Sequence, residues 1–174
     1  VRFEEALGGP PPEPGVSLNE SFKGQIDIAV KGQLFTSYHF GEGVVRPYLH
    51  PVVGPYDKSV TRGFPMIPDV PGEVKDHPHH RSIWVAHGDV NKVDNWSELS
   101  GHGRMVHRGF EKRIEGPVYA ELISKNDWVN HHGMKVLEEE RRILVYNTPP
   151  HVRIMDMEMA FHATEGDVTF GDTK

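Results

Sequence analysis

The chain has 174 residues, of which 37% are hydrophobic, and its formal net charge is −6 at pH 7. This length suits one domain, or part of a larger β domain, and the composition is sufficient for a core. The negative balance leaves no basic surface for nucleic acid or for an anionic membrane. Because the chain has no cysteine, disulfides, thiolate zinc sites and a cysteine nucleophile are excluded. No apolar run approaches the length of a membrane span.

Residues 1–22 are rich in proline and glycine, and they are predicted to form a linker or a disordered arm. Residues 23–174 are predicted to form the N-terminal portion of one β-sandwich domain. The chain does not begin with Met, and residues 167–172 have the pattern of a strand that has just begun. We therefore expect a fragment that is truncated at its C-terminal side. A soluble protein is expected, and cytoplasmic, periplasmic and secreted locations all stay open.

Strand signals recur along the rest of the chain. Residues 25–30 and 34–40 flank a turn at Gly32, which predicts a hairpin. Residues 47–53 are bracketed by prolines, which suits an edge strand or the start of a strand. Residues 54–78 are predicted to form a long ordered loop. Further strands are predicted at residues 82–86, 103–115, 117–125, 134–147 and 151–163. The predicted fold class is mainly β, an antiparallel β-sandwich.

Residues 76–96 hold four of the twelve histidines, together with three aspartates, one arginine and two tryptophans. This mixture is poorly suited to a core and well suited to a pocket. Pro78 lacks a backbone donor and keeps His77 out of the helical region, which predicts a rigid extended turn. Residues 82–86 follow as a short buried strand, and Gly88 begins a second polar turn. The sequence therefore predicts that this stretch presents polar side chains to a ligand.

This stretch has the residue types needed for general acid–base chemistry on a sugar. His79 or His80 is predicted to give or take a proton. Arg81 is predicted to hold a substrate oxygen or carboxylate through its planar fork. Further residues are predicted to contact the substrate in the same pocket. They are Arg46, Arg62, His87, Asp89 and the ring face of Trp96.

A metal site is the alternative interpretation of the same residues. Histidines two positions apart on an extended segment point the same way, so His77 and His79 can share one ion, with His87 completing the set. The protein would then be a hydrolase or lyase that depends on a divalent metal; otherwise no cofactor is predicted. A structural role also stays open, because polar residues beside turns often only satisfy backbone donors. That role is favoured for Asp94 and Trp84.

The motifs of the chain resemble those of the PmoA-like family of bacterial proteins, also called DUF6807. The resemblance runs from about residue 25 to the end, and it rests on residues 46–51, 60–62, 76–81, 87–91 and 165–174. Members are commonly labelled "methane oxygenase PmoA". The methane monooxygenase subunit of that name is a membrane protein, and this sequence contains no span. We therefore expect the label to be wrong for this chain.

The resemblance implies a galactose-mutarotase-like β-sandwich and a role in sugar metabolism. Enzymes of that kind use a histidine acid and a carboxylate base, with an arginine and further histidines holding the sugar. By analogy His79 or His80 and Arg81 fall in that pocket, and the base is expected beyond Lys174. The expected protein is carbohydrate-active, either epimerase-like or acting on a modified sugar, with a small carbohydrate as its partner. A non-catalytic sugar-binding module is a further alternative, and the sequence does not predict the oligomeric state.

Overall fold

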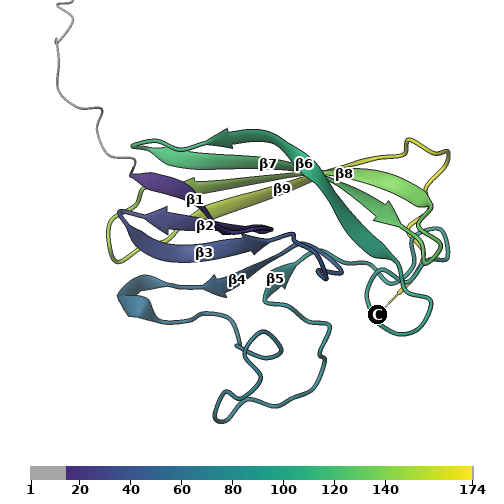
Figure 1. The fold of residues 1–174 in the computed structure, drawn as a ribbon, viewed down its shortest axis with the longest axis horizontal. Coiled ribbons are helices and arrows are strands. Elements are labelled where there is room, and N and C mark those ends of the chain that lie inside the picture. Colours follow the sequence, from purple (N-terminus) through teal and green to yellow (C-terminus); the bar gives the residue numbers. More distant parts are fainter. Residues whose placement is uncertain (1–14, 174) are drawn as a thin grey trace, which may run out of the picture.

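The computed structural model describes residues 15–173, which form two antiparallel sheets that face each other (Figure 1). The first sheet consists, in spatial order, of β1 (Val16–Phe22), β2 (Gln25–Val30), β3 (Gln33–His39), β4 (Tyr48–Val52) and β5 (Ile83–Trp84). The second consists of β6 (Arg104–Ile114), β7 (Tyr119–Val129), β8 (Lys135–Tyr146) and β9 (Met155–His162). A single 3-10 turn, η1 (Pro55–Asp57), is the helical element of the described residues. The predicted mainly β sandwich is confirmed.

A core of alternating apolar side chains lies between the two sheets. Ile143 and Val145 are two positions apart on β8, so they share one face of the strand. They belong to one buried cluster with Ile26 and Ile28 of β2. Fully burying an aliphatic side chain of this size contributes about 1.5–3 kcal/mol. The sandwich is therefore stabilised by the inward faces that the strand patterns predict.

A smaller cluster anchors the loop that follows β5. Val90 of this loop is completely buried with Met105 of β6 and Trp128 of β7, and Val93 packs against the same cluster from the loop. The loop is thus fixed to the second sheet by its apolar residues.

The predicted hairpin at Gly32 is confirmed. β2 pairs with β3 from Gln25–His39 to Val30–Gln33. Lys31 and Gly32 both have positive φ, at 51° and 76°. Two such residues in a two-residue loop give a turn whose twist matches that of the flanking strands.

β8 is a strand throughout, although residues 138–142 in its middle are a run of glutamates and arginines. The run alternates between the two faces of the sheet. Glu139 and Arg141 point inward and are at most 1% exposed, and Arg141 Nε donates to Glu139 Oε1 at 2.6 Å. Trp128 Nε1 donates to Glu139 Oε2 at 2.7 Å, and Arg141 Nη1 donates to the backbone oxygen of Pro47 at 2.9 Å. The pair is tolerable in the interior because each charge has partners, and it fastens β8 to the start of β4.

The predicted arm is wrong at its C-terminal end. Residues 16–22 form β1, which pairs with β2 from Val16–Val30 to Phe22–Gln25. Val16 is the one fully buried side chain of this strand. The apolar pattern is therefore weak, and the glycines and prolines before it obscure the strand. Residues 1–14 of the predicted arm lie outside the described residues.

Two further predictions need correction. Within residues 82–86 only Ile83–Trp84 form a strand, and both side chains are half-buried rather than buried. Ser82 has φ 58°, in the left-handed region, so the chain enters β5 directly from a turn. Residues 167–172 form no strand, and their pairing is an isolated bridge between Phe170 and Val90.

The proline-bracketed strand, β4, lies between β3 and β5 instead of at an edge. Pro51 is nevertheless accommodated, since the pairing with β5 covers only Tyr48 and Leu49. On the other side, the register with β3 shifts between Thr36 and Tyr38, and irregular positions of this kind accept proline. The connection from β4 to β5 is long and contains only the short turn η1, in agreement with the predicted long loop. It extends away from both sheets (Figure 1).

Candidate functional site

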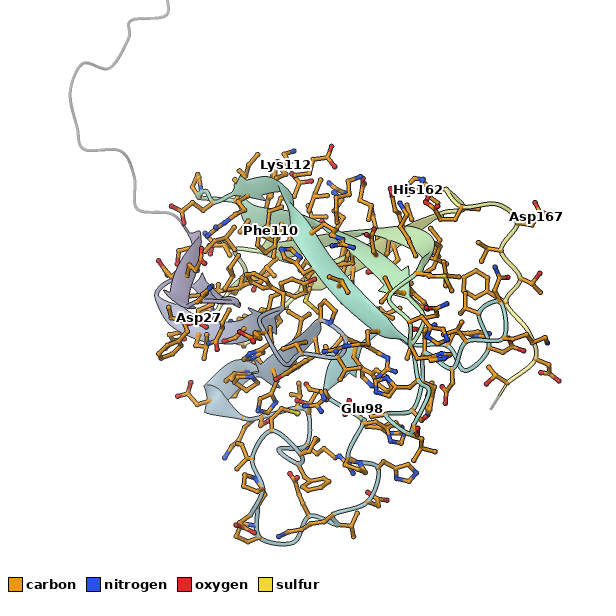
Figure 2. The ribbon with its side chains drawn as sticks, turned by 45° about the vertical axis from the view of Figure 1, so that its right-hand side comes forward. Asp27, Glu98, Phe110, Lys112, His162 and Asp167 are labelled. Atoms are coloured by element: carbon orange, nitrogen blue, oxygen red, sulfur yellow. The ribbon has the colours of Figure 1, made fainter. Side chains whose placement is uncertain are left out.

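The histidine-rich turn, residues 77–80, forms one wall of a pocket with a volume of about 570 Å³. The loop between β4 and β5 supplies this wall, and the loop between β5 and β6 supplies the opposite one. Figure 2 shows Glu98, of the second loop, where the loops meet the edge of the first sheet. The lining residues are His77, Pro78, His79, His80, Trp96, Ser97, Glu98 and Leu99. A pocket of this size suits a small-molecule ligand.

A cluster of aromatic rings holds the two loops together. The ring centroids of Trp84 and Trp96 are 5.2 Å apart. His80 lies 5.3 Å from Trp96 and 5.5 Å from Trp84, and His79 meets His80 edge-to-face at 4.5 Å. Rings at these separations attract each other beyond their area of contact. The cluster therefore orients both histidines, with Trp84 behind them and Trp96 in the pocket wall.

Asp94 shapes the loop that carries Trp96. Its Oδ1 accepts the backbone N–H groups of Trp96 at 2.7 Å and Ser97 at 3.0 Å, and its Oδ2 accepts the Ser97 hydroxyl. Burial acts to raise the pKa of Asp94, but these hydrogen bonds outweigh it and the pKa is lowered. Asp94 thus forms an Asx-type turn, in line with its expected structural role.

His79 and His80 both line the pocket. Burial lowers the pKa of each below the ordinary histidine value, and the adjacent imidazoles lower it further. Both rings are therefore neutral near pH 7, so each presents one donor and one acceptor nitrogen. Nε2 of His80 is buried without a hydrogen-bond partner among residues 15–173. His79 has no nitrogen buried in this way, so it is the better placed of the two to reach a ligand.

His77 has a carboxylate partner. Its Nδ1 lies 2.9 Å from Oδ2 of Asp76, and Nη1 of Arg62 donates to Oδ1 of the same carboxylate at 2.7 Å. The arginine, and after it His77, hold the pKa of Asp76 below its usual range. Arg62 also donates to the backbone oxygens of Asp76 and His77. Its guanidinium therefore tethers the histidine turn instead of facing the pocket.

Arg81 is occupied by Glu98. The Nε and Nη2 atoms of Arg81 donate to the Glu98 carboxylate at 3.0–3.2 Å, and the guanidinium lies over the Tyr48 ring, 5.9 Å from its centroid. Arg81 does not line the pocket, whereas Glu98 does. The sequence prediction missed Glu98. The available signal was a carboxylate two positions after Trp96 in the same polar turn.

Arg46 lies behind the pocket and is 2% exposed. Its Nη2 donates to the backbone oxygen of Ser97 at 2.6 Å, and its Nη1 is 3.9 Å from Oε1 of Glu98. Its guanidinium is also 5.7 Å from the centroid of the Trp84 ring. Burial lowers the pKa of Arg46 to about 10, against the opposing effect of Glu98. Arg46 thus supports the loop of Trp96 from inside the protein.

His87 and Asp89 do not line this pocket. Nε2 of His87 is 2.9 Å from the backbone oxygen of Gly171, and Asp89 accepts both the backbone N–H and the ammonium of Lys92. His77, His79 and His87 therefore do not form a common ligand set. Within residues 15–173, no three His, Cys, Asp or Glu side chains are arranged to hold a metal ion.

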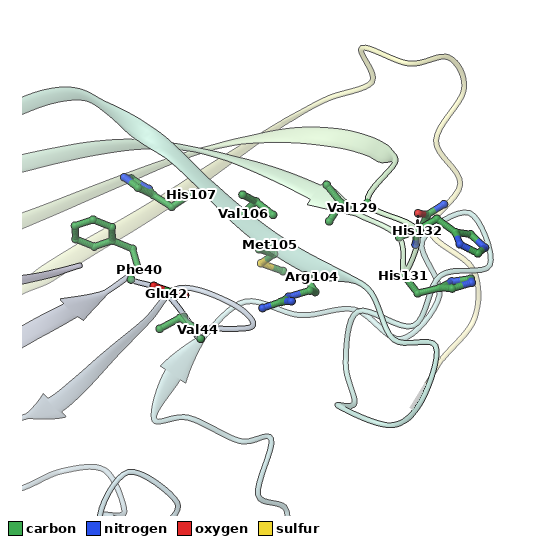
Figure 3. Close-up of a pocket in the computed structure, with 14 residues that line it drawn as sticks. Phe40, Glu42, Val44, Arg104, Met105, Val106, His107, Val129, His131 and His132 are labelled. Carbon is green, nitrogen blue, oxygen red and sulfur yellow. Dashed lines mark hydrogen bonds between the residues drawn. The ribbon is translucent and has the colours of Figure 1, made fainter. Parts of the chain in front are cut away.

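A second pocket of about 570 Å³ lies beside β6 (Figure 3). His107 and Phe40 lie together at one end, with ring centroids 4.4 Å apart, and His131 and His132 lie at the far end on the β7–β8 turn. Nδ1 of His107 is 3.3 Å from Oδ1 of Asn126, and burial lowers the pKa of this histidine. The titratable groups are spread along this pocket, so it is the weaker candidate for chemistry.

Comparison with known families identifies the family to which the chain is similar. The sequence profile described as "Family of unknown function (DUF6807)" matches residues 25–174, which confirms the resemblance at the level of the family. Comparisons with curated proteins and with solved structures found no match. In residues 15–173, no helix has the length and apolar character needed to cross a membrane.

Proposed function

This chain belongs to the DUF6807 family, and we propose that its histidine-lined pocket binds a carbohydrate and carries out acid–base chemistry on it. The observation that carries the proposal is the meeting of a tryptophan, two neutral histidines and a carboxylate in one pocket of about 570 Å³. The proposal includes the galactose-mutarotase-like relationship that the sequence resemblance implies.

The mixed character of the pocket supports sugar binding. A pyranose ring has apolar C–H faces and a rim of hydroxyl groups, so it needs an apolar platform beside polar groups. Trp96 supplies the platform in the wall of the pocket. Ser97 and Glu98, which follow it directly, bring a hydroxyl and a carboxylate to the same wall. The Glu98 carboxylate can accept hydrogen bonds from sugar hydroxyls, whereas the Ser97 hydroxyl already donates to Asp94 and accepts the backbone N–H of Leu99.

The histidines support the chemical part of the proposal. Exchange of anomers needs one group that takes the proton of the anomeric hydroxyl and another that gives a proton to the ring oxygen. A neutral imidazole takes a proton and only its protonated form gives one, so the proton that one imidazole takes from the anomeric hydroxyl is passed to the second imidazole, which gives it to the ring oxygen. His79 is the proposed acid–base group in contact with the sugar, and His80 is the second imidazole. Arg81 acts through Glu98, which it holds at the pocket wall.

A non-catalytic sugar-binding module is the second candidate. Among the described residues, no carboxylate is hydrogen-bonded to His79 or to His80, and Asp76 instead contacts His77. A histidine acid–base pair is usually oriented by such a partner. The same pocket would then bind a sugar without changing it.

The test is a panel of neutral hexoses and hexuronic acids followed by NMR, which reads binding by saturation transfer and turnover by exchange between anomers or epimers. His79→Gln is compared with wild type, and His131→Gln, on the β7–β8 turn, is the matched control. Turnover that is lost in His79→Gln and kept in His131→Gln supports the enzyme. Binding without turnover supports the module. The absence of binding for every sugar contradicts both.

A further inference from the structure

We infer that the pocket selects neutral sugars over sugar acids, and that Glu98 sets this selectivity by occupying the fork of Arg81. The inference rests on the proposed function and adds to it the charge of the substrate. The observation behind it is that the arginines near the pocket are paired with groups of the protein itself.

No arginine or lysine is among the residues that line the pocket. The three arginines close to it are all engaged with the protein. Arg62 donates to the Asp76 carboxylate and to backbone oxygens. Arg81 makes its two-pronged pair with Glu98, and Arg46 donates to backbone oxygens from a buried position. Among residues 15–173, a carboxylate on the ligand would therefore find no free cation at the pocket.

Glu98 is the charged carboxyl side chain in the pocket lining. A ligand carboxylate would have to leave water for a partly apolar pocket and approach this like charge, and both steps are unfavourable. A neutral sugar meets no such penalty, because its hydroxyls can donate to the Glu98 oxygens. The arrangement therefore discriminates by charge, and the repulsive element is as important as the attractive one.

The opposite selectivity, in which a sugar acid binds more tightly than a neutral sugar, would also involve Arg81 and Glu98. If a sugar acid displaced Glu98, it would take over the planar fork of Arg81, which is well suited to carboxylates. This exchange would cost Glu98 its attraction to Arg46, whose Nη1 is 3.9 Å from Oε1 of Glu98, as well as its pair with Arg81, so the ligand carboxylate would have to compensate for both losses. The relative affinities for a neutral sugar and for the matching sugar acid distinguish the two selectivities.

The experiment is a titration of tryptophan fluorescence with matched pairs: glucose and glucuronate, and galactose and galacturonate. The pH is held at about 8, above the ordinary histidine pKa, so that the imidazoles stay neutral. We expect the neutral member of a pair to bind about tenfold more tightly than the acid, a difference of about 1.4 kcal/mol. In Glu98→Gln this ratio should fall or reverse, because the amide carries no charge and leaves part of the Arg81 fork free.

Glu158→Gln is the matched control, because Glu158 lies on the edge strand β9 and its carboxylate pairs with an arginine, Arg142 of β8. It should leave the ratio unchanged. Equal or tighter binding of the acid to wild-type protein overturns the inference while the sugar site stands, and so does an unchanged ratio in Glu98→Gln. If no member of either pair binds, the sugar site itself is wrong. The wild-type comparison stays decisive if Glu98→Gln does not fold.

Discussion

The guanidinium of Arg81 and the carboxylate of Glu98 face each other, with 3.0 Å between Nη2 and Oε2 and 3.2 Å between Nε and Oε1. This pair joins the end of the histidine turn to the loop that carries Trp96, across 17 positions of sequence. Both side chains are about a quarter exposed, at 28% and 26%. At that exposure an ion pair stabilises the fold only slightly, so its main effect is to position the carboxylate.

Replacement of Arg81 separates these two effects. Arg81→Ala should lower the free energy of unfolding by no more than about 1 kcal/mol, yet weaken sugar binding because Glu98 is no longer held. Arg81→Lys keeps the charge but loses the fork, so its affinity should be intermediate. Urea unfolding and sugar titration measure the two quantities. Arg108→Ala, which removes an exposed pair with Asp127, is the control, and unchanged affinity in Arg81→Ala would exclude the positioning role.

Trp96 provides a second prediction, on the platform itself. Trp96→Ala should reduce the affinity for a neutral sugar by about tenfold or more, since the ring face is lost. Trp96→Phe should retain part of the affinity, because a smaller face remains. Equilibrium titration by calorimetry measures both variants without relying on the fluorescence of the replaced residue. Equal affinities for Trp96→Ala and wild type would place the sugar elsewhere.

The histidines make stability dependent on pH. Five of them have a pKa below the ordinary value, with burial as the first cause in each case: His39, His50, His79, His80 and His107. The unfolded chain, with histidine pKa values of about 6.5, binds more protons than the folded protein just below that pH. The stabilisation is therefore complete above about 6.5 and is lost progressively as the pH falls further.

This dependence can be measured separately from that of the carboxylates. Carboxylates with a lowered pKa change stability only below their unfolded values of about 4–4.5. The urea midpoint should therefore fall between about pH 7.5 and pH 5 through the histidines alone. His107→Gln should make the slope shallower, whereas the exposed His132→Gln should not. A midpoint that does not change over this range would contradict the prediction.

The interior pair predicts a contrast between neighbouring glutamates on β8. Glu139→Gln leaves the buried Arg141 without its countercharge and should cost about 3 kcal/mol or more. Glu140→Gln breaks only the partly exposed pair with Lys125 and should cost about 1 kcal/mol or less. Urea unfolding of both variants tests the assignment of these residues to opposite faces. Similar costs for the two would argue against a buried charge pair.

Most of the fold could be predicted from the sequence because strands and hairpins are specified locally. The strand over residues 134–147 and the turn at Gly32 depend on neighbouring residues alone, and both predictions are confirmed. β1 was missed because only Val16 of that strand is fully buried. Its position depends on pairing with β2, which no local pattern reports.

The candidate site likewise has features that follow from local sequence and features that depend on the tertiary structure. The sequence by itself determined that His77, His79 and His80 lie together, since a turn containing Pro78 keeps neighbouring residues close. Only the tertiary structure decided which partners they meet. Contacts between side chains of separate loops depend on how the loops are packed. This packing brings the Glu98 carboxylate to the Arg81 guanidinium and the His87 ring to the backbone oxygen of Gly171. Whether an arginine faces a ligand or the protein is likewise settled by burial, which a sequence pattern alone does not encode.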